Sequence, residues 1–392
     1  MKKTLLSFAV LGALAGSAAA ADVTLYGLVD YGFNYQHTDG DAANGDAGDR
    51  FEMRSGMNSG SRFGLKGTED LGNGYTVGFV LENGFDADDG TFDSNGDSRI
   101  FGREAQLFVK GFWGQLGFGR VGQLASANGT YSLLGQTSPF SSGWGESVGQ
   151  KFVTANGWAR FDNTVTYVSP NFAGFQVHAQ YSFKNDTTKK GEEGKASADR
   201  YYGIAATFKA DNLYLVGIVD SINHGNYLSY LQDQPYTYDD DQWTFTIGGN
   251  YDFQFMKVYA MAQYFKNAAG VGQKYIGDSG FGSNGYTYAD TPFAEGADGY
   301  GIALGIGVPC FGGTAKAHVG YMDAEASNKW SNTGTDGSMT RWNIAVGYDY
   351  NLSKRTSVYT AAAYTKDDLK NYNTSGIEPS AVEVMAGMIH RF

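Results

Sequence analysis

The residue types that most often carry catalysis occur in this chain without a recognisable catalytic arrangement. The histidines are scattered, without the pair spacing of a metal site, at His37, His178, His224, His318 and His390. No Gly-x-Ser-x-Gly elbow and no phosphate-binding loop is present. A Ser/His/Asp site assembled across strands remains an alternative, with His178 as its candidate. We therefore predict a protein that is not an enzyme and that needs no cofactor.

Aspartates gather in polar stretches and raise the question of calcium binding. Asp39-Gly40-Asp41 and the stretch from Asp93 to Asp97 bring oxygen ligands close together. Neither stretch has the ligand spacing of a calcium-binding loop or its closing glutamate. We therefore expect solvated acidic loops and no metal site.

Other charged residues lie on segments in which polar and apolar residues alternate, so that their side chains share one face of a strand. The polar faces carry Arg62, Lys66, Glu82, Arg160 and Asp162. The opposite faces carry aromatic residues such as Phe63, Phe79 and Phe161. Such strands have one face toward water and one toward an apolar medium.

This alternation recurs through nearly the whole chain and predicts about 16 strands, one over 51–69 and the last over 380–392. Tight turns alternate with long polar loops along the chain. The loops lie at 37–50, 87–98, 123–158, 185–199, 224–240, 268–296, 325–337 and 367–379. A soluble sandwich gives no reason for this regular alternation of short and long connections. We therefore predict an all-β fold: a closed antiparallel transmembrane β-barrel with short periplasmic turns and long extracellular loops.

Residues 1–21 have the features of a cleaved signal peptide: Lys2 and Lys3, a short apolar run, and the small residues Ala18 to Ala21. Its removal leaves residues 22–392 as one barrel domain and takes the formal charge from −12 to −14. Such an acidic chain is not expected to bind nucleic acid. Cys310 is the only cysteine, which excludes an intrachain disulfide.

Several segments resemble the trimeric general porins of Neisseria and Burkholderia type. The matching segments are Asp22 to Gly27, Ser61 to Gly72, Arg103 to Arg120, Asn163 to Pro170 and His390 to Phe392. The stretch 185–337 matches only in its alternation. The resemblance implies a homotrimer in which the third long loop, residues 123–158, folds inward and narrows the lumen.

The resemblance also implies an arginine-bearing wall opposite this loop, at Arg62, Arg103 and Arg160. Arg103 fits less well, because its parity is that of apolar Leu107 and Val109. The expected pore constriction comprises Arg62, Lys66, Arg103 and Arg160 together with Glu82, Glu146 and Asp162. Glu146 is the only carboxylate of the third loop. This charge pattern favours a weak anion preference, which the acidic outer loops oppose.

The expected partners follow from a barrel in the outer membrane. Phe392 resembles the carboxy-terminal signal that the barrel-assembly machinery reads. Outer-membrane lipid and lipopolysaccharide would surround the protein, with divalent ions able to bridge the acidic loops to lipopolysaccharide.

The predicted function is therefore that of a general diffusion porin of a Gram-negative outer membrane, a water-filled channel for ions and small hydrophilic solutes. One alternative is a substrate-selective channel for organic anions or sugars, with Tyr227, Tyr230, Tyr236 and Tyr238 as stacking residues. Another is a barrel enzyme or an adhesin.

Overall fold

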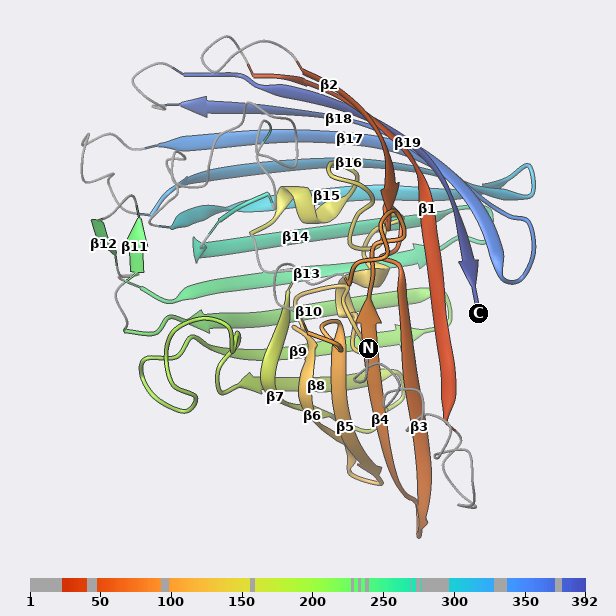
Figure 1. The fold of residues 1–392 in the computed structure, drawn as a ribbon, viewed down its shortest axis with the longest axis vertical. Coiled ribbons are helices and arrows are strands. Elements are labelled where there is room, and N and C mark those ends of the chain that lie inside the picture. The colour runs from red at the N-terminus through yellow and green to blue at the C-terminus, as the bar shows by residue number, and fades with distance from the viewer. Residues whose placement is uncertain are drawn as a thin grey trace, which may run out of the picture.

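The chain forms a closed barrel because its first strand pairs on both edges. The computed structural model describes residues 23–40, 48–92, 99–155, 159–226, 229–231, 234–236, 240–268, 270–272, 276, 296–327, 337–370 and 376–392. β1 (Thr24–Asp39) pairs with β19 (Ser380–Arg391) on one edge and with β2 (Gly48–Ser55) and β3 (Arg62–Gly72) on the other. The predicted closed antiparallel barrel is confirmed (Figure 1).

The other strands follow one another around the wall, each antiparallel to the next. They are β4 (Tyr75–Gly84), β5 (Glu104–Gly111), β6 (Gly114–Gly122), β7 (Arg160–Val168), β8 (Phe175–Ser182), β9 (Arg200–Ala210), β10 (Leu213–Asn223), β13 (Gln242–Asp252), β14 (Lys257–Ala268), β15 (Ala297–Cys310), β16 (Gly313–Ala326), β17 (Ser338–Asn351) and β18 (Thr356–Lys370). β11 (Ser229–Leu231) and β12 (Gln234–Tyr236) form a separate ribbon. Two 3₁₀ turns, Leu133–Gln136 and Gln150–Val153, lie in the third loop.

The single strand predicted over 51–69 is wrong, because residues 56–61 leave the sheet between β2 and β3. Gly56 has a φ of 70°, and the Asp30 carboxylate accepts the N–H groups of Asn58 (2.8 Å) and Ser59 (2.7 Å). Met57 is buried on the lumen side, among residues of the third loop. Because β2 and β3 pair with successive parts of β1, the sheet has seventeen strands in sixteen wall positions.

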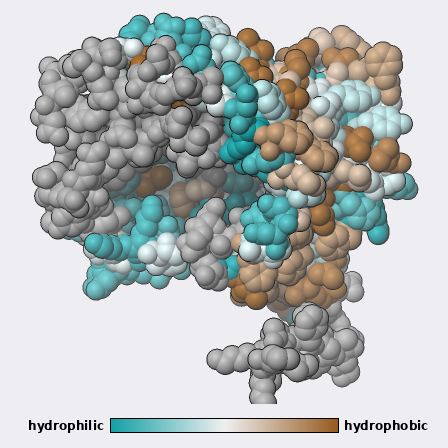
Figure 2. Space-filling view, turned by 45° about the horizontal axis from the view of Figure 1, so that its top comes forward, coloured by the Kyte–Doolittle hydropathy of each residue, from teal (hydrophilic) through white to brown (hydrophobic). Residues whose placement is uncertain are grey.

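Each strand separates a lipid face from a lumen face, as the alternation predicts. Along β17 the side chains of Trp342, Ile344 and Val346 are about half exposed, whereas those of Arg341 and Asn343 are fully buried. Figure 2 shows apolar residues gathered over one side of the outer surface, in the right half of the view. This pattern is the one that lipid outside and a polar lumen inside require.

Several sequence-based candidates cannot be placed in this fold. The expected signal peptide, residues 1–21, lies outside the described residues, as do Asp41, Asp93 and Asp97 and the side chains of the four candidate stacking tyrosines. Within the part of the chain that the structure describes, no helix is long and apolar enough to cross a membrane. In that same part, no group of His, Cys, Asp or Glu residues is placed to hold a metal ion.

The third loop lies against the inside of the wall, where the strands carry glycine. Figure 1 shows this loop (yellow) in front of β14 to β16. A Cβ atom at Gly301 of β15 would meet the backbone oxygen of Val153, and one at Gly347 of β17 would lie 2.7 Å from the Phe140 ring. The wall is therefore shaped to receive the loop, because any larger side chain at these positions would push the loop away.

We predict that Gly301→Ala destabilises the barrel by about 1–3 kcal/mol, because the Val153 carbonyl belongs to a fixed backbone. Urea unfolding in lipid vesicles, followed by tryptophan fluorescence, measures the change. Gly217→Ala is the matched control, because a Cβ there, on β10, meets nothing within 4 Å. Equal unfolding midpoints for the two variants would contradict the packing of the loop on β15.

Candidate functional site: the third loop and the charged wall

Apolar contacts attach the third loop to the lumen wall along its length. The loop begins against β9 and β10, crosses to β17–β19 and β1, and returns to β14–β17. Its buried anchors are Leu124, Leu133, Leu134, Phe140, Trp144, Val148, Phe152 and Val153. The expected inward fold of this loop is confirmed. The loop therefore covers much of the lumen side of β9–β19, and it also contacts β5, where Glu104 accepts from Thr130 and Gln106 accepts from Tyr131. Among the described residues, the loop makes no hydrogen bond to β3 or β4.

A carboxylate on the wall binds the tip of the loop. Glu383 of β19 is fully buried and accepts the backbone N–H groups of Glu146 (3.0 Å) and Ser147 (2.8 Å). The Ser147 hydroxyl donates to the same carboxylate at 2.7 Å. Charge-assisted hydrogen bonds of this kind satisfy loop amides that the lumen packing removes from water.

The Glu146 side chain is compensated by two arginines of β2. Arg54 Nη1 lies 2.5 Å from Glu146 Oε1, and Arg50 Nη2 lies 3.1 Å from Oε2. Glu52 adds a second carboxylate beside the same two arginines. The expected constriction residue Glu146 is therefore buried and paired, and it does not present a free charge to the lumen.

A second charged cluster lies on the wall at β3–β5. Glu82 of β4 accepts a hydrogen bond from Arg103 Nε at 2.8 Å and one from the Tyr26 hydroxyl at 3.0 Å, and Arg62 Nε lies 3.6 Å away. Lys66 is exposed, with its Nζ 5.1 Å from the centre of the Tyr26 ring. The structure thus brings together four of the seven expected residues: Arg62, Lys66, Glu82 and Arg103.

Arg103 precedes β5, so the alternation of faces along that strand does not fix the direction of its side chain. Its backbone N–H donates to the Glu82 carbonyl at 3.2 Å, and its side chain turns toward the Glu82 carboxylate. The next residue, Glu104, begins the strand and points to the third loop, where it accepts the Thr130 N–H at 3.1 Å. Arg103 therefore contacts the cluster from a position just outside the strand.

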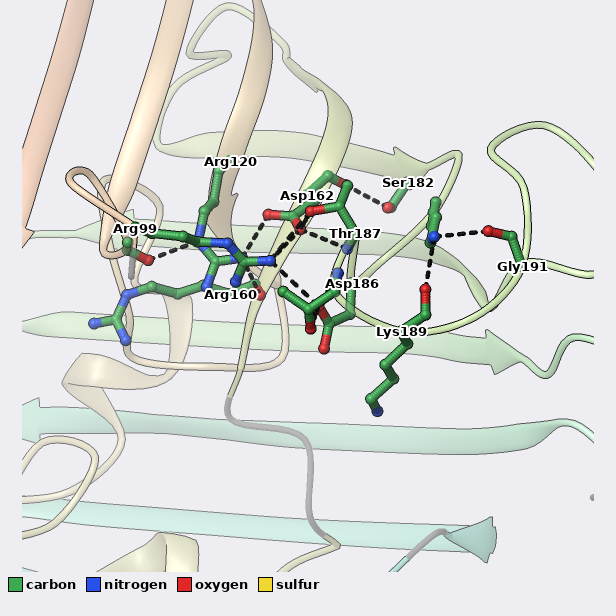
Figure 3. Close-up of polar contacts among 12 residues, drawn as sticks. Arg99, Arg120, Arg160, Asp162, Ser182, Asp186, Thr187, Lys189 and Gly191 are labelled. Carbon is green, nitrogen blue, oxygen red and sulfur yellow. Dashed lines mark hydrogen bonds and ion pairs between the residues drawn. The ribbon is translucent and has the colours of Figure 1, made fainter. Parts of the chain in front are cut away.

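Asp162 belongs to a third cluster, shown in Figure 3. Arg120 Nη1 lies 2.6 Å from one Asp162 oxygen, and Arg99 Nη2 lies 2.9 Å from the other, which also accepts the Thr187 N–H at 2.8 Å. Arg99 reaches Asp186 as well, at 3.3 Å. Burial would raise the pKa of Asp186, but hydrogen bonds from Thr188 and Arg99 outweigh it and hold that pKa below its ordinary value. This cluster ties the segment before β5 to the connection between β8 and β9.

Arg160 lies beside this cluster but does not pair with Asp162. Its Nη2 donates to the Asn128 side chain of the third loop at 3.4 Å. The alternation predicted for β7 is wrong at its first residues, because Asn163 has a φ of 51° and the pairing with β6 shifts there. Phe161, expected to face outward, instead packs against buried Tyr201 with ring centres 4.8 Å apart. An extra residue at a β-bulge reverses the faces in this way.

The face of the third loop that stays accessible is uncharged except at one lysine. Thr130, Gln136 and Ser141 are exposed, and Lys151 is partly exposed. Since Glu146 is buried, the loop offers no accessible carboxylate opposite the arginines.

Sequence reasoning missed Arg50, Arg54, Arg99, Arg120 and Glu383 as residues of these clusters. Glu383 had a usable signal, because it alternates with apolar Val382 and Val384 in the last strand. Arg54 also had one, since it shares the parity of Arg62. Arg99 and Arg120 had none, because their pairing with Asp162 depends on contacts between segments far apart in the chain.

Comparisons with known proteins agree with this geometry. The family model described as Gram-negative porin matches residues 7–370. An outer membrane porin of Bordetella pertussis is 33% identical over 421 residues, with 100% of both chains covered. Outer membrane porin protein 32 of Delftia acidovorans is 29% identical, with 97% of this chain and 94% of that protein covered. Among solved structures, an anion-selective porin from Comamonas acidovorans is similar in fold, with 24% identity, a TM-score of 0.63, and 95% of this chain and 100% of that one covered.

We predict that Glu383→Ala destabilises the folded protein by about 2–4 kcal/mol, because the buried N–H groups of Glu146 and Ser147 lose their acceptor. Urea unfolding measures the change, and limited proteolysis shows whether the third loop becomes cleavable near Glu146.

Glu378→Ala is the matched control. Its carboxylate is 57% exposed and pairs with Lys366 at the surface, so we expect a change of at most about 0.5 kcal/mol. A Glu383→Ala protein that unfolds like Glu378→Ala and resists cleavage would contradict the anchoring of the tip.

Proposed function

Since this chain belongs to the Gram-negative porin family, we propose that its outer-membrane channel passes ions and small hydrophilic solutes by passive diffusion, with a weak preference for anions. Porins are channels rather than enzymes, and we propose no chemistry for the lumen. The proposed constriction comprises Arg62, Lys66, Glu82 and Arg103 of the wall at β3–β5, Arg160 and Asp162 of β7, and Glu146 of the third loop.

The observation that supports the anion preference is the excess of cations among the described residues of the wall at β3–β5. Two of the three clusters are internally balanced: Arg50 and Arg54 face Glu146 and Glu52, while Arg99 and Arg120 face Asp162 and Asp186. The cluster around Glu82 sets Arg62, Arg103 and Lys66 against one carboxylate. Glu104 of β5 adds a second carboxylate, which is buried against the third loop, so three cations still face two anions. A ring with surplus positive charge lowers the barrier for anions.

The acidic outer loops oppose this preference and keep it weak. Asp89 and Asp49 are exposed, and each already accepts hydrogen bonds from neighbouring side chains: Asp89 from Thr91, Asp49 from Tyr35 and His37. Mobile salt screens exposed charges beyond about 8 Å at physiological ionic strength, whereas the half-buried arginines are screened less. The charges at the constriction therefore decide whether anions or cations are preferred. The acidic outer loops reduce the strength of that preference.

We also propose a homotrimer embedded in outer-membrane lipid and lipopolysaccharide. A structure of similar fold, OmpT of Vibrio cholerae, is described as a trimer form. For biogenesis we propose that the barrel-assembly machinery recognises Phe392. In support, the Phe392 backbone exchanges two hydrogen bonds of 3.1 Å with Gly27, so the last residue completes the closure of the barrel while its ring stays 46% exposed.

We predict that Arg62→Ala and Arg103→Ala each reduce the anion preference, and that the double variant becomes cation-preferring, because Glu82 then loses both arginine partners. The reversal potential in a planar bilayer under a salt gradient measures this.

Lys354→Ala is the charge-matched control, since Lys354 is exposed in the turn between β17 and β18. A wild-type protein that conducts but prefers cations would overturn the selectivity. A folded protein without conductance would overturn the channel itself.

A further inference from the structure

A second chain segment enters the lumen and pairs with the third loop. Val271, from the connection between β14 and β15, forms an antiparallel bridge with Ala155. The Gly272 N–H donates to the Thr154 carbonyl at 2.7 Å. Residues 270–272 are all buried. The end of the third loop and this segment (270–272) therefore form one irregular pair of strands inside the barrel.

Arg341 of β17 lies where these two segments meet the wall. Its side chain is fully buried, and Nη1 donates to the Phe152 carbonyl at 3.1 Å and to the Gly272 carbonyl at 2.8 Å. Its Nε and Nη2 make a two-pronged pair with Asp367 of β18, at 2.6 Å and 2.7 Å. One guanidinium thus joins the third loop, the second segment and two wall strands.

We propose that Arg341 is a positioning residue for the channel: it clamps both inward segments to the β17–β18 wall and so fixes the width of the open path. This inference rests on the proposed constriction by the third loop. It adds that segment 270–272 forms part of the constriction's support, and that one wall residue holds both pieces.

An arginine is better suited than a methionine or a lysine to hold both segments at once. Met322, Met339 and Leu369 are buried on the same part of the lumen wall. A buried ion pair gains little stability over apolar residues of similar size. A planar guanidinium, however, donates in several directions at once, which a methionine cannot do and a lysine does only from a single point. Buried carbonyls need such donors, and Arg341 supplies one to each of the two irregular segments.

The test compares Arg341→Met with wild type in planar bilayers, using single-channel current and the exclusion of polyethylene glycols of increasing size. Arg341→Met keeps an unbranched stem but is shorter than arginine and removes the guanidinium that forms the clamp. We expect a severalfold rise in open-channel noise, a broader distribution of conductance steps and entry of larger polymers. Arg341→Lys should show part of the wild-type behaviour, since a lysine retains the positive charge beside Asp367 but lacks the planar guanidinium.

Lys366→Met is the matched control, because Lys366 lies on β18 and pairs with Glu378 at the exposed surface. Its noise and polymer cut-off should equal those of wild type. A folded Arg341→Met channel that is also indistinguishable from wild type would overturn the inference. The proposed function would survive that result, whereas a wild-type protein that does not conduct would remove both.

Two further variants keep the test decisive if Arg341→Met does not fold. Gly272→Ala leaves the Arg341–Asp367 pair in place, yet a Cβ at this positive φ of 70° would meet Arg341 Nη1. It should raise the noise in the same way, and a quiet Gly272→Ala channel would count against the clamp.

The other variant joins the two segments to each other covalently, so that the remaining contacts of either one with the wall hold both. Ala155→Cys and Val271→Cys, combined with Cys310→Ser, join the two segments at bridge partners. In an Arg341→Lys background, oxidation should quiet the channel and reduction should restore the noise. Noise that does not change with oxidation, once the disulfide is verified by mass, would contradict the proposal.

Discussion

The architecture depends on the requirement that every backbone N–H and C=O group facing lipid be hydrogen bonded within the sheet. β1 meets this requirement by pairing with β19 and with β2 and β3, which leaves the wall without an open edge. Closure gives each strand one lipid face and one lumen face, and so places Arg62, Glu82, Arg341 and Glu383 inside the barrel. The channel is thus a consequence of how the sheet avoids unpaired edges.

Backbone groups of the irregular segments that are buried inside the lumen also need hydrogen-bond partners. Side chains of the wall supply many of them: Asp30 for residues 58–59, Glu383 for residues 146–147, Gln263 for the Ala155 N–H, and Arg341 for two carbonyls. Glycines such as Gly301 and Gly347 provide room for the loop. Much of the buried charge therefore serves to hold backbone.

The sequence predicted what depends on local periodicity. The barrel, its wall positions and the lipid faces of strands such as β17 follow from alternation of side chains, which is a local property. The break at residues 56–61 and the bulge at Asn163 were missed, since the first depends on the distant Asp30 and the second on pairing with β6. Of the candidate site, Arg62 and Glu82 followed from parity. The pairing of Glu146 with Arg50 and Arg54 depends on tertiary contact and left no pattern in the sequence.

Hydrogen–deuterium exchange of the folded protein in lipid vesicles tests whether the third loop is a fixed part of the barrel interior. We expect the amides of Gly145, Glu146, Ser147, Val148 and Ala155 to exchange as slowly as those of the neighbouring strands, because each has an acceptor inside the barrel. Exchange of these amides as fast as in the exposed turn around Gly90 would show that the loop is not fixed to the wall.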